Sequence, residues 1–161
     1  MTIGFILNGE DVVAKAEANY RLVDILRGSF NLLGAKTGCL NGRCGSCSVI
    51  FNGKVIPACA IPAFHVRGSE IITLEGFTQT DEYQDIIKGF AEAKVETCGY
   101  CDAAKILAID AFLDLIKKPT RDEAALAFDG VICRCTEPSS LIDALLATAE
   151  IRQRRLYGRA P

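Results

Sequence analysis

Three cysteines lie within nine consecutive positions of this 161-residue sequence, in a stretch filled out by glycines and polar residues. They are Cys39, Cys44 and Cys47, spaced C-x4-C-x2-C, and Cys59 follows with eleven residues between it and Cys47. Thiolates are soft ligands that select zinc, copper(I) or iron–sulfur clusters. The stretch therefore predicts a metal centre, with Cys59 as the fourth ligand.

The spacing of this first set is that of plant-type 2Fe–2S sites. Such a cluster carries negative charge, and Gly38, Gly42 and Gly45 would let backbone N–H groups approach it and adopt positive φ angles. A four-cysteine zinc site and unrelated buried thiols are the alternatives. Zinc loops usually pair one C-x2-C with a second, and this half of the chain has only one. We predict a first 2Fe–2S cluster on these cysteines.

A second set of four cysteines follows, Cys98-x2-Cys101 and, after 31 residues, Cys133-x-Cys135. The spacing alone could also hold zinc, although C-x-C is uncommon in structural zinc sites. Each pair precedes an expected helix, whose first N–H groups and positive dipole end favour thiolate charge. We expect these four residues to hold a second 2Fe–2S cluster.

The elements around the first set are mostly strands. Asn8–Gly9 and Asn52–Gly53 each separate two apolar runs, as expected for two β-hairpins with two-residue turns. The second hairpin would bring Cys59 back to the cysteine loop. Residues 70–76 are predicted to form a further strand ending in a turn. A short helix is expected at 20–30, with an apolar face of Leu22, Ile25 and Leu26.

After about residue 78 the apolar spacing becomes helical. Thr120 and Glu123 form a capping-box signature, Gly130 is a natural stop, and Pro138 suits a first helical turn. Helices are expected at 81–94, 103–118, 120–130 and 138–155. The fold class is thus α+β, with a boundary in 76–82 between a strand-rich part (1–77) and a helical part (78–161).

Composition narrows the classes of function. The net charge of −2 gives no support to nucleic-acid binding. No apolar run approaches the roughly 18 residues of a membrane span, and the N-terminal sequence lacks the pattern of a secretory signal. Eight cysteines without such a signal argue against disulfides and favour metal ligation in the cytoplasm. The basic end is expected to be solvated, with a docking segment as the alternative; it comprises Arg152, Arg154, Arg155 and Arg159.

Over essentially its whole length the chain resembles the small iron–sulfur subunit of molybdenum hydroxylases, the family of xanthine and aldehyde oxidoreductases and carbon monoxide dehydrogenase. The resemblance is carried by "GCLNGRCGSCSV" with Cys59 in "PACA", by "CGYC" at 98–101 and by "CRCT" at 133–136. It implies a plant-ferredoxin-like β-grasp domain (1–77) followed by an all-α four-helix domain (78–161). Each domain would carry one 2Fe–2S cluster.

The resemblance also implies the function. Electrons would pass from a molybdenum–pterin centre in a large partner subunit through the helical-domain cluster to the ferredoxin-domain cluster. They would then reach an FAD-binding medium subunit or another acceptor. The chain would be an enzyme only as part of this hetero-oligomer, with no catalytic residue of its own, because the substrate chemistry belongs to the partner's cofactor. A free-standing ferredoxin-like carrier and a zinc-stabilised interaction protein are the alternatives.

The sequence departs from the family pattern beside the second set. Thr97 stands where the family commonly has a glutamine that contacts the pterin, and a threonine hydroxyl is too short to replace that amide. Asp102, Ala103 and Ala104 replace Thr-Pro-Gly, and Asp102 is expected to cap the next helix. Glu137 and Pro138 likewise replace Gly-Tyr. We therefore expect a divergent branch with an altered cofactor-facing surface.

Four other side chains near the cysteines are interpreted from their types. His65 is expected to be structural or interfacial, because one histidine cannot supply the pair of a Rieske site. Arg43 could donate towards the cluster, contact a flavin partner, or be an exposed loop cation. Tyr100 is expected to face either the helical core or the partner, with core packing favoured, and no specific role follows for Arg134.

Overall fold

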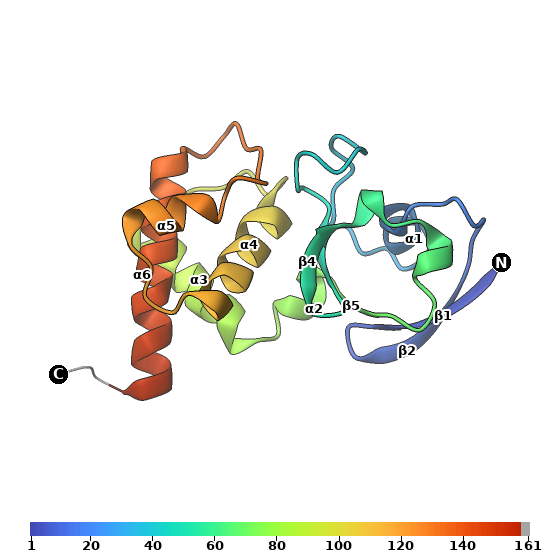
Figure 1. Cartoon of the computed structure of the whole chain (residues 1–161), viewed down its shortest axis with the longest axis horizontal. Helices are drawn as coiled ribbons and strands as arrows, with labels where there is room; N and C mark the ends of the chain where they lie inside the picture. Colours follow the sequence, from blue (N-terminus) through green and yellow to red (C-terminus); the bar gives the residue numbers. More distant parts are fainter. Residues whose placement is uncertain (159–161) are drawn as a thin grey trace.

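The computed structural model describes residues 1–158 as a mixed α+β structure. A five-stranded sheet with the order β2-β1-β5-β3-β4 forms the N-terminal half (Figure 1). The β1–β5 pair is parallel and the other three pairs are antiparallel. The strands are β1 (Thr2–Leu7), β2 (Glu10–Lys15), β3 (Ser48–Phe51), β4 (Lys54–Pro57) and β5 (Glu70–Ile72).

Both predicted hairpins are confirmed. Asn8 and Gly9 connect β1 to β2 with φ angles of 52° and 87°, and Asn52 and Gly53 connect β3 to β4 with φ angles of 48° and 78°. Positive φ at both central residues is the requirement of a type I′ turn, whose twist matches that of the paired strands. The second turn determines the register that brings the chain back towards the cysteine loop, with Ser48 opposite Pro57.

The strand predicted at 70–76 is shorter than expected. It ends at Ile72 and is followed by the short helix α2 (Leu74–Phe77). The reason is the side chain of Asn8, whose Oδ1 accepts the Thr73 N–H at 2.8 Å and so takes it away from any neighbouring strand. The chain therefore turns into a helix where the sequence alone suggested a turn.

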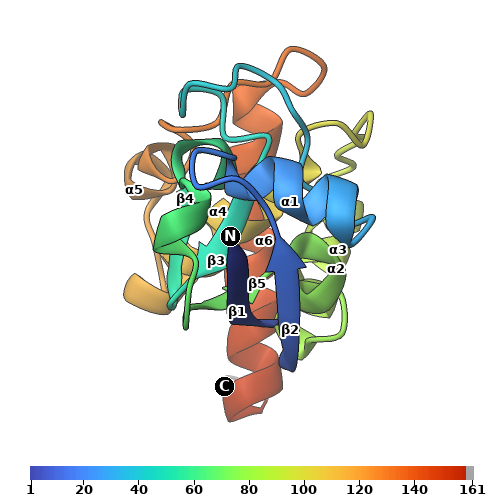
Figure 2. The ribbon, with the colours of Figure 1, turned by 90° about the vertical axis from the view of Figure 1, so that its right-hand side faces the viewer.

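Helix α1 (Leu22–Ser29) covers one face of the sheet, as Figure 2 shows from the side of β1 and β2. Its apolar face is buried as predicted, and Leu22, Ile25 and Leu26 are each at most 2% exposed. They pack with inward-facing residues of the strands, among them Ile3, Val49 and Ile71. Two single-turn 3-10 helices, η1 (Ala58–Ala60) and η2 (Ala63–His65), connect β4 to β5.

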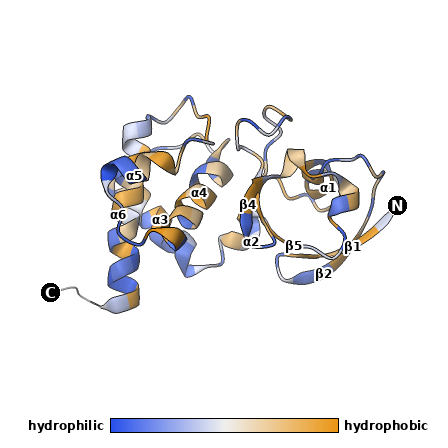
Figure 3. Ribbon diagram, viewed as in Figure 1, coloured by the Kyte–Doolittle hydropathy of each residue, from blue (hydrophilic) through white to orange (hydrophobic). Residues whose placement is uncertain are grey.

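The four helices expected in the second half are present; the first three end two to four residues earlier than predicted, and the last ends two residues later. They are α3 (Asp81–Glu92), α4 (Asp102–Leu115), α5 (Arg121–Leu126) and α6 (Pro138–Tyr157). The capping box of Thr120 and Glu123 is confirmed at the start of α5, and Pro138 lies in the first turn of α6. Helix α4 is apolar over most of its length, whereas α6 becomes polar towards its C-terminal end (Figure 3).

The helices pack on one another and on the second face of the sheet. Helices α3 and α6 approach closely at Gly89, where an added Cβ would lie 2.1 Å from the Thr148 hydroxyl. Ile50, Val55 and Ile72 of the sheet pack against the helical core. The sheet thus lies between α1 and α4. Whether the two halves are separate domains divided at 77 and 78 stays a prediction.

The prediction of a solvated basic end is wrong for Arg152, whereas Arg155 is exposed but ion-paired. Arg152 is 3% exposed, and its guanidinium donates to Asp110 at 2.7 Å. Arg155 donates to Asp85 at 2.8 Å and to Glu82 at 3.0 Å. The pairing follows from the contact of α6 with α3 and α4, which a one-dimensional pattern does not reveal. Arg154 is exposed as expected, and Arg159 lies outside the described residues.

Within residues 1–158 no helix is both long and apolar enough to cross a bilayer.

Candidate metal centres

The first cysteine set lies on two segments that the sheet holds together. Cys39, Cys44 and Cys47 lie in the loop between α1 and β3, and Cys59 lies in η1, directly after β4. The β3–β4 hairpin brings Cys59 back to this loop, as predicted, and its N–H donates to Cys47 Sγ at 3.4 Å. Cys47 and Cys59 are buried, and the other two cysteines are partly exposed.

Backbone N–H groups point at the sulfurs of this set. Those of Arg43 and Cys44 donate to Cys39 Sγ at 3.2 and 3.3 Å, and that of Gly42 donates to Cys59 Sγ at 3.2 Å. The N–H groups of Asn41 and Cys44 lower the pKa of Cys39 to about 6. The loop therefore favours negative charge on sulfur, which is what a thiolate ligand of a cluster needs.

Two glycines of this loop have no room for a side chain. A Cβ at Gly38 would lie 2.5 Å from Ser46 Oγ and 2.8 Å from Cys44 Sγ. At Gly45, where φ is +73°, it would lie 2.8 Å from the carbonyl oxygen of Gly130 in the second half of the chain. The glycines thus allow the loop to close tightly around its own sulfurs and against the loop that follows α5.

The second cysteine set gathers from two loops at helix N-termini. Cys98 and Cys101 precede α4, with Cys101 in its N-cap position, and Cys133 and Cys135 precede α6. Cys135 Sγ lies 3.1 Å from Cys98 Sγ and 3.5 Å from Cys133 Sγ. Burial opposes ionisation of Cys133, but hydrogen bonds from the Cys101 thiol and from the N–H groups of Cys135 and Thr136 lower its pKa to about 6.

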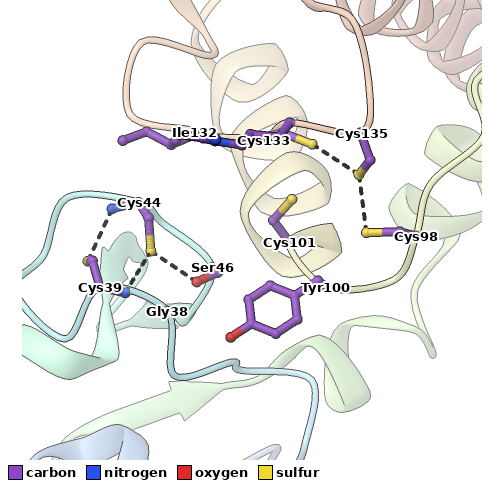
Figure 4. Close-up of a pocket in the computed structure, with 11 residues that line it drawn as sticks. Gly38, Cys39, Cys44, Ser46, Cys98, Tyr100, Cys101, Ile132, Cys133 and Cys135 are labelled. Carbon is purple, nitrogen blue, oxygen red and sulfur yellow. Dashed lines mark hydrogen bonds between the residues drawn. The ribbon is translucent and has the colours of Figure 1, made fainter.

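Six of the eight cysteines line one cavity of about 430 Å³ (Figure 4). It is lined by Cys39 and Cys44 on one side and by all four cysteines of the second set on the other. The loops that carry them lie at the same, upper edge of the molecule in Figure 1. A hydrogen bond of 3.2 Å from the Ile132 N–H to the Cys44 carbonyl joins the loop of Cys133 and Cys135 to the first loop.

Tyr100 makes a second link between the sets, and its expected core packing is wrong. The side chain is 48% exposed, and its hydroxyl donates to the Thr37 carbonyl at 3.2 Å. Its ring points towards the first cysteine loop (Figure 4). The sequence placed Tyr100 between two cysteines but could not show which segment lies opposite it.

Asp102 also differs from its expected role. Cys101 occupies the N-cap position of α4. The Asp102 carboxylate instead accepts the hydroxyl of Thr97 at 3.0 Å and the ammonium of Lys105 at 3.2 Å. Thr97, which stands where the family resemblance places a glutamine, thus directs its hydroxyl to a residue of its own chain.

Lys105 is a residue that sequence reasoning missed. It is completely buried in the first turns of α4, below the second cysteine set. The only signal in the sequence is a lysine within the apolar run "AAKILAI". A lysine in such a run can equally well extend along the helix to solvent, so the pattern alone did not single it out.

The remaining side chains near the cysteines have modest surroundings. His65 is exposed and stacks on Phe51 with ring centroids 6.3 Å apart, as expected for a structural residue. Arg43 is exposed, and its backbone N–H donates to Cys39. Arg134 lines the cavity beside Cys133 and Cys135.

Both sets fit a 2Fe–2S cluster better than a single ion. Within residues 1–158 no three histidine, cysteine, aspartate or glutamate side chains are grouped to hold one metal ion. A 2Fe–2S cluster instead takes two cysteines on each of two irons. The first set divides into Cys39 with Cys44 and Cys47 with Cys59 by its N–H···S contacts. In the second set Cys135 Sγ contacts both Cys98 Sγ and Cys133 Sγ, and the Cys101 thiol hydrogen-bonds Cys133.

Comparisons with known proteins agree with this fit. A family model described as a 2Fe-2S binding domain matches residues 73–146. The nicotinate dehydrogenase small FeS subunit of Eubacterium barkeri is 42% identical over 136 residues, which are 84% of this chain and 87% of that protein. A nicotinate dehydrogenase subunit of Pseudomonas putida is 32% identical over 95% of this chain and 98% of its own length.

A solved structure shares the whole fold. The crystal structure of quinoline 2-oxidoreductase from Pseudomonas putida 86 contains a chain with a TM-score of 0.86 and 33% identity, and the match covers 96% of each chain. The match spans both halves of the present chain, so the sheet and the helices are arranged alike in the two proteins.

Proposed function

The chain belongs to the small iron–sulfur subunits of the molybdenum hydroxylases, and we propose that it carries two 2Fe–2S clusters, one on each cysteine set. It is the electron-transfer subunit of an oxidoreductase complex. The observation that supports two clusters is that the cysteines gather in two groups of four. Cys39, Cys44 and all four cysteines of the second set line one cavity, and Cys59 donates its N–H to Cys47 Sγ beside it. The proposed ligands are Cys39, Cys44, Cys47 and Cys59 for the first cluster and Cys98, Cys101, Cys133 and Cys135 for the second.

The proposed architecture assigns one cluster to each half of the chain. Residues 1–77 form a plant-ferredoxin-like β-grasp domain around the first cluster, and residues 78–161 form a four-helix domain around the second. The separate apolar cores of the two halves support this division. The α4 helix, packed on β3 and β4, holds Cys101 next to the first cysteine loop.

In the proposed direction of transfer, electrons enter at the second set from the molybdenum–pterin centre of a large partner subunit. They leave through the first set to an FAD-binding subunit or another acceptor. Bound clusters supply one-electron steps. The chain's own residues hold and orient them: backbone N–H groups stabilise thiolate charge, and burial excludes water from Cys47, Cys59 and Cys101. Cys98 and Cys135 are exposed, as a surface that receives electrons from a partner requires.

We further propose that the complex works in the cytoplasm. All eight cysteines are free in the structure, and the reducing cytosol keeps thiols available for metal ligation.

The test is a purification of the complex through this chain, followed by iron analysis and EPR spectroscopy of the reduced protein. We expect a large molybdenum-containing chain in the complex and about four irons per copy of this chain. Cys47→Ser should remove about two irons and one EPR signal, and Cys135→Ser should remove the other two irons and the other signal. Each variant serves as the control for the other.

Three outcomes would contradict parts of the proposal. A brown chain with full iron content that purifies alone would indicate a free-standing ferredoxin-like carrier. A colourless chain with zinc and no iron would indicate a structural role. Loss of both signals in each single variant would show that the cysteines are not divided into these two ligand sets.

A further inference from the structure

The buried cation of α4 is unexplained by cluster ligation. Lys105 is 0% exposed, although lysine is almost never fully buried unless it is paired. Its ammonium lies 3.2 Å from Asp102 Oδ1 and 3.4 Å from Thr136 Oγ1. The contact with Asp102 is an ion pair in which the lysine side chain is fully buried and the aspartate side chain is 22% exposed.

Around this ammonium, hydrogen bonds connect both loops of the second cysteine set. Thr97, which precedes Cys98, donates to Asp102 at 3.0 Å. Thr136, which follows Cys135, donates to the carbonyl of Glu96 at 3.2 Å. Lys105 contacts both Asp102 and Thr136, so its head group joins the first residue of α4 to the loop before α6.

We propose that Lys105 is a positioning residue for the second cluster: its buried ammonium raises the reduction potential of that cluster, and the Asp102 carboxylate limits this effect. The inference rests on the proposed function, because it needs a cluster on Cys98, Cys101, Cys133 and Cys135. A cluster gains one negative charge on reduction, and a nearby fixed positive charge favours the reduced state. Inside a protein, with an effective dielectric constant near 20, such a charge is screened far less than in water.

The arrangement predicts opposite effects for the two members of the pair. Lys105→Met removes the positive charge and leaves the Asp102 carboxylate, so the potential of the second cluster should fall. Asp102→Asn removes the negative charge and leaves the ammonium, so the potential should rise. The double variant removes both charges and should return the potential towards that of the wild type.

The experiment is a redox titration of the purified complex, with the EPR signals of the two clusters followed separately. At a fixed ambient potential we expect at least a tenfold lower ratio of reduced to oxidised second cluster in Lys105→Met, which is a shift of about 59 mV for a one-electron couple. Asp102→Asn should shift the ratio in the opposite direction. The first cluster is the internal reference. The matched control is Lys118→Met, because Lys118 is an exposed lysine beyond the C-terminal end of α4.

The possible outcomes separate this inference from the proposed function. Shifts of opposite sign confined to the second cluster would support it. Shifts of the same sign in the two variants would overturn it. If Lys105→Met fails to assemble, an unchanged potential in Asp102→Asn would still overturn it, because Asn keeps the shape and hydrogen-bonding capacity of Asp. Absence of a second cluster from the wild-type complex would instead overturn the proposed ligand set.

Discussion

Replacing Arg152 with methionine tests whether the buried charges between α3, α4 and α6 stabilise the helical half. The guanidinium lies 2.7 Å from Asp110, 3.5 Å from Asp114 and 3.9 Å from Asp85. Removing one partner of a buried ion pair costs about 3–5 kcal/mol, because the other charge stays buried without compensation. Asp85 would keep Arg155 at 2.8 Å. We therefore expect the lower end of this range, about 3 kcal/mol.

Hydrogen exchange followed by mass spectrometry on the purified complex measures this loss locally. Each 1.4 kcal/mol of lost stability raises the open population tenfold. Some α3 and α6 peptides exchange through opening of the helical half, and these should exchange about 100-fold faster in Arg152→Met than in the wild type. Peptides from β1 and β2 are the internal reference. Arg154→Met is the matched control, because Arg154 is exposed and, within residues 1–158, pairs only with Glu150 at 3.6 Å. Its cost should stay below about 0.5 kcal/mol.

The reasoning would be refuted if Arg152→Met and Arg154→Met changed the exchange of α6 by the same factor. A second variant checks the cause of the loss. Asp110→Asn, added to Arg152→Met, removes the carboxylate that would otherwise stay buried without its arginine, and it should slow exchange relative to Arg152→Met alone. No such recovery would mean that packing of the arginine side chain, and not its charge, stabilises these helices.

Two further substitutions test the loop of the first set and a partly buried carboxylate. Gly38→Ala places a methyl group 2.8 Å from Cys44 Sγ, and it should remove about two irons and the first EPR signal. Gly28→Ala is the control: a Cβ at Gly28 meets nothing within 4 Å, so this variant should keep both clusters. Burial raises the pKa of Glu75, but the Gly34 N–H at 2.7 Å helps to bring it below its ordinary 4.5. Because the folded-state pKa is lowered, Glu75 stabilises the fold fully above about pH 4.5, and this stabilisation is lost as the pH falls through the lowered value. Glu75→Gln should therefore be less stable than wild type at pH 7, by under about 1 kcal/mol. Urea unfolding at pH 3.5 should show a smaller difference in stability between the two proteins. A difference that grows in acid would contradict the assignment.

The features that the sequence predicted well depend on neighbouring residues. Asn8–Gly9 and Asn52–Gly53 require positive φ at two adjacent positions, and few residue pairs other than Asn-Gly and its relatives provide it. The capping box of Thr120 and Glu123 likewise depends on residues three positions apart. The order and spacing of the cysteines carried the prediction of the cluster sites for the same reason, since the loop geometry is encoded within a few residues.

The features that the sequence did not predict depend on elements far apart in the chain. Arg152 and Arg155 resemble solvated charges in a basic end until α6 packs on α3 and α4, and Tyr100 resembles a core residue until the loop of Thr37 lies opposite it. Lys105 has no distinguishing neighbour in the sequence apart from Asp102. Each of these side chains finds its partner only through tertiary contact, which residue spacing does not encode.

The two buried cations together determine how α4 sits between the halves of the molecule. Near its first turn α4 contributes Lys105 to the second cysteine set, and further along it contributes Asp110 to Arg152 of α6. Successive residues of an α-helix are rotated by about 100°. A shift of α4 by one residue would therefore move Lys105 away from Thr136 and Asp110 away from Arg152, while Asp102, on the same helix, would stay with Lys105. Loss of the buried Asp110–Arg152 pair costs several kcal/mol. Because Cys101 is the residue before α4, the same pairs that fix the helix also fix the position of a proposed cluster ligand against the first cysteine loop.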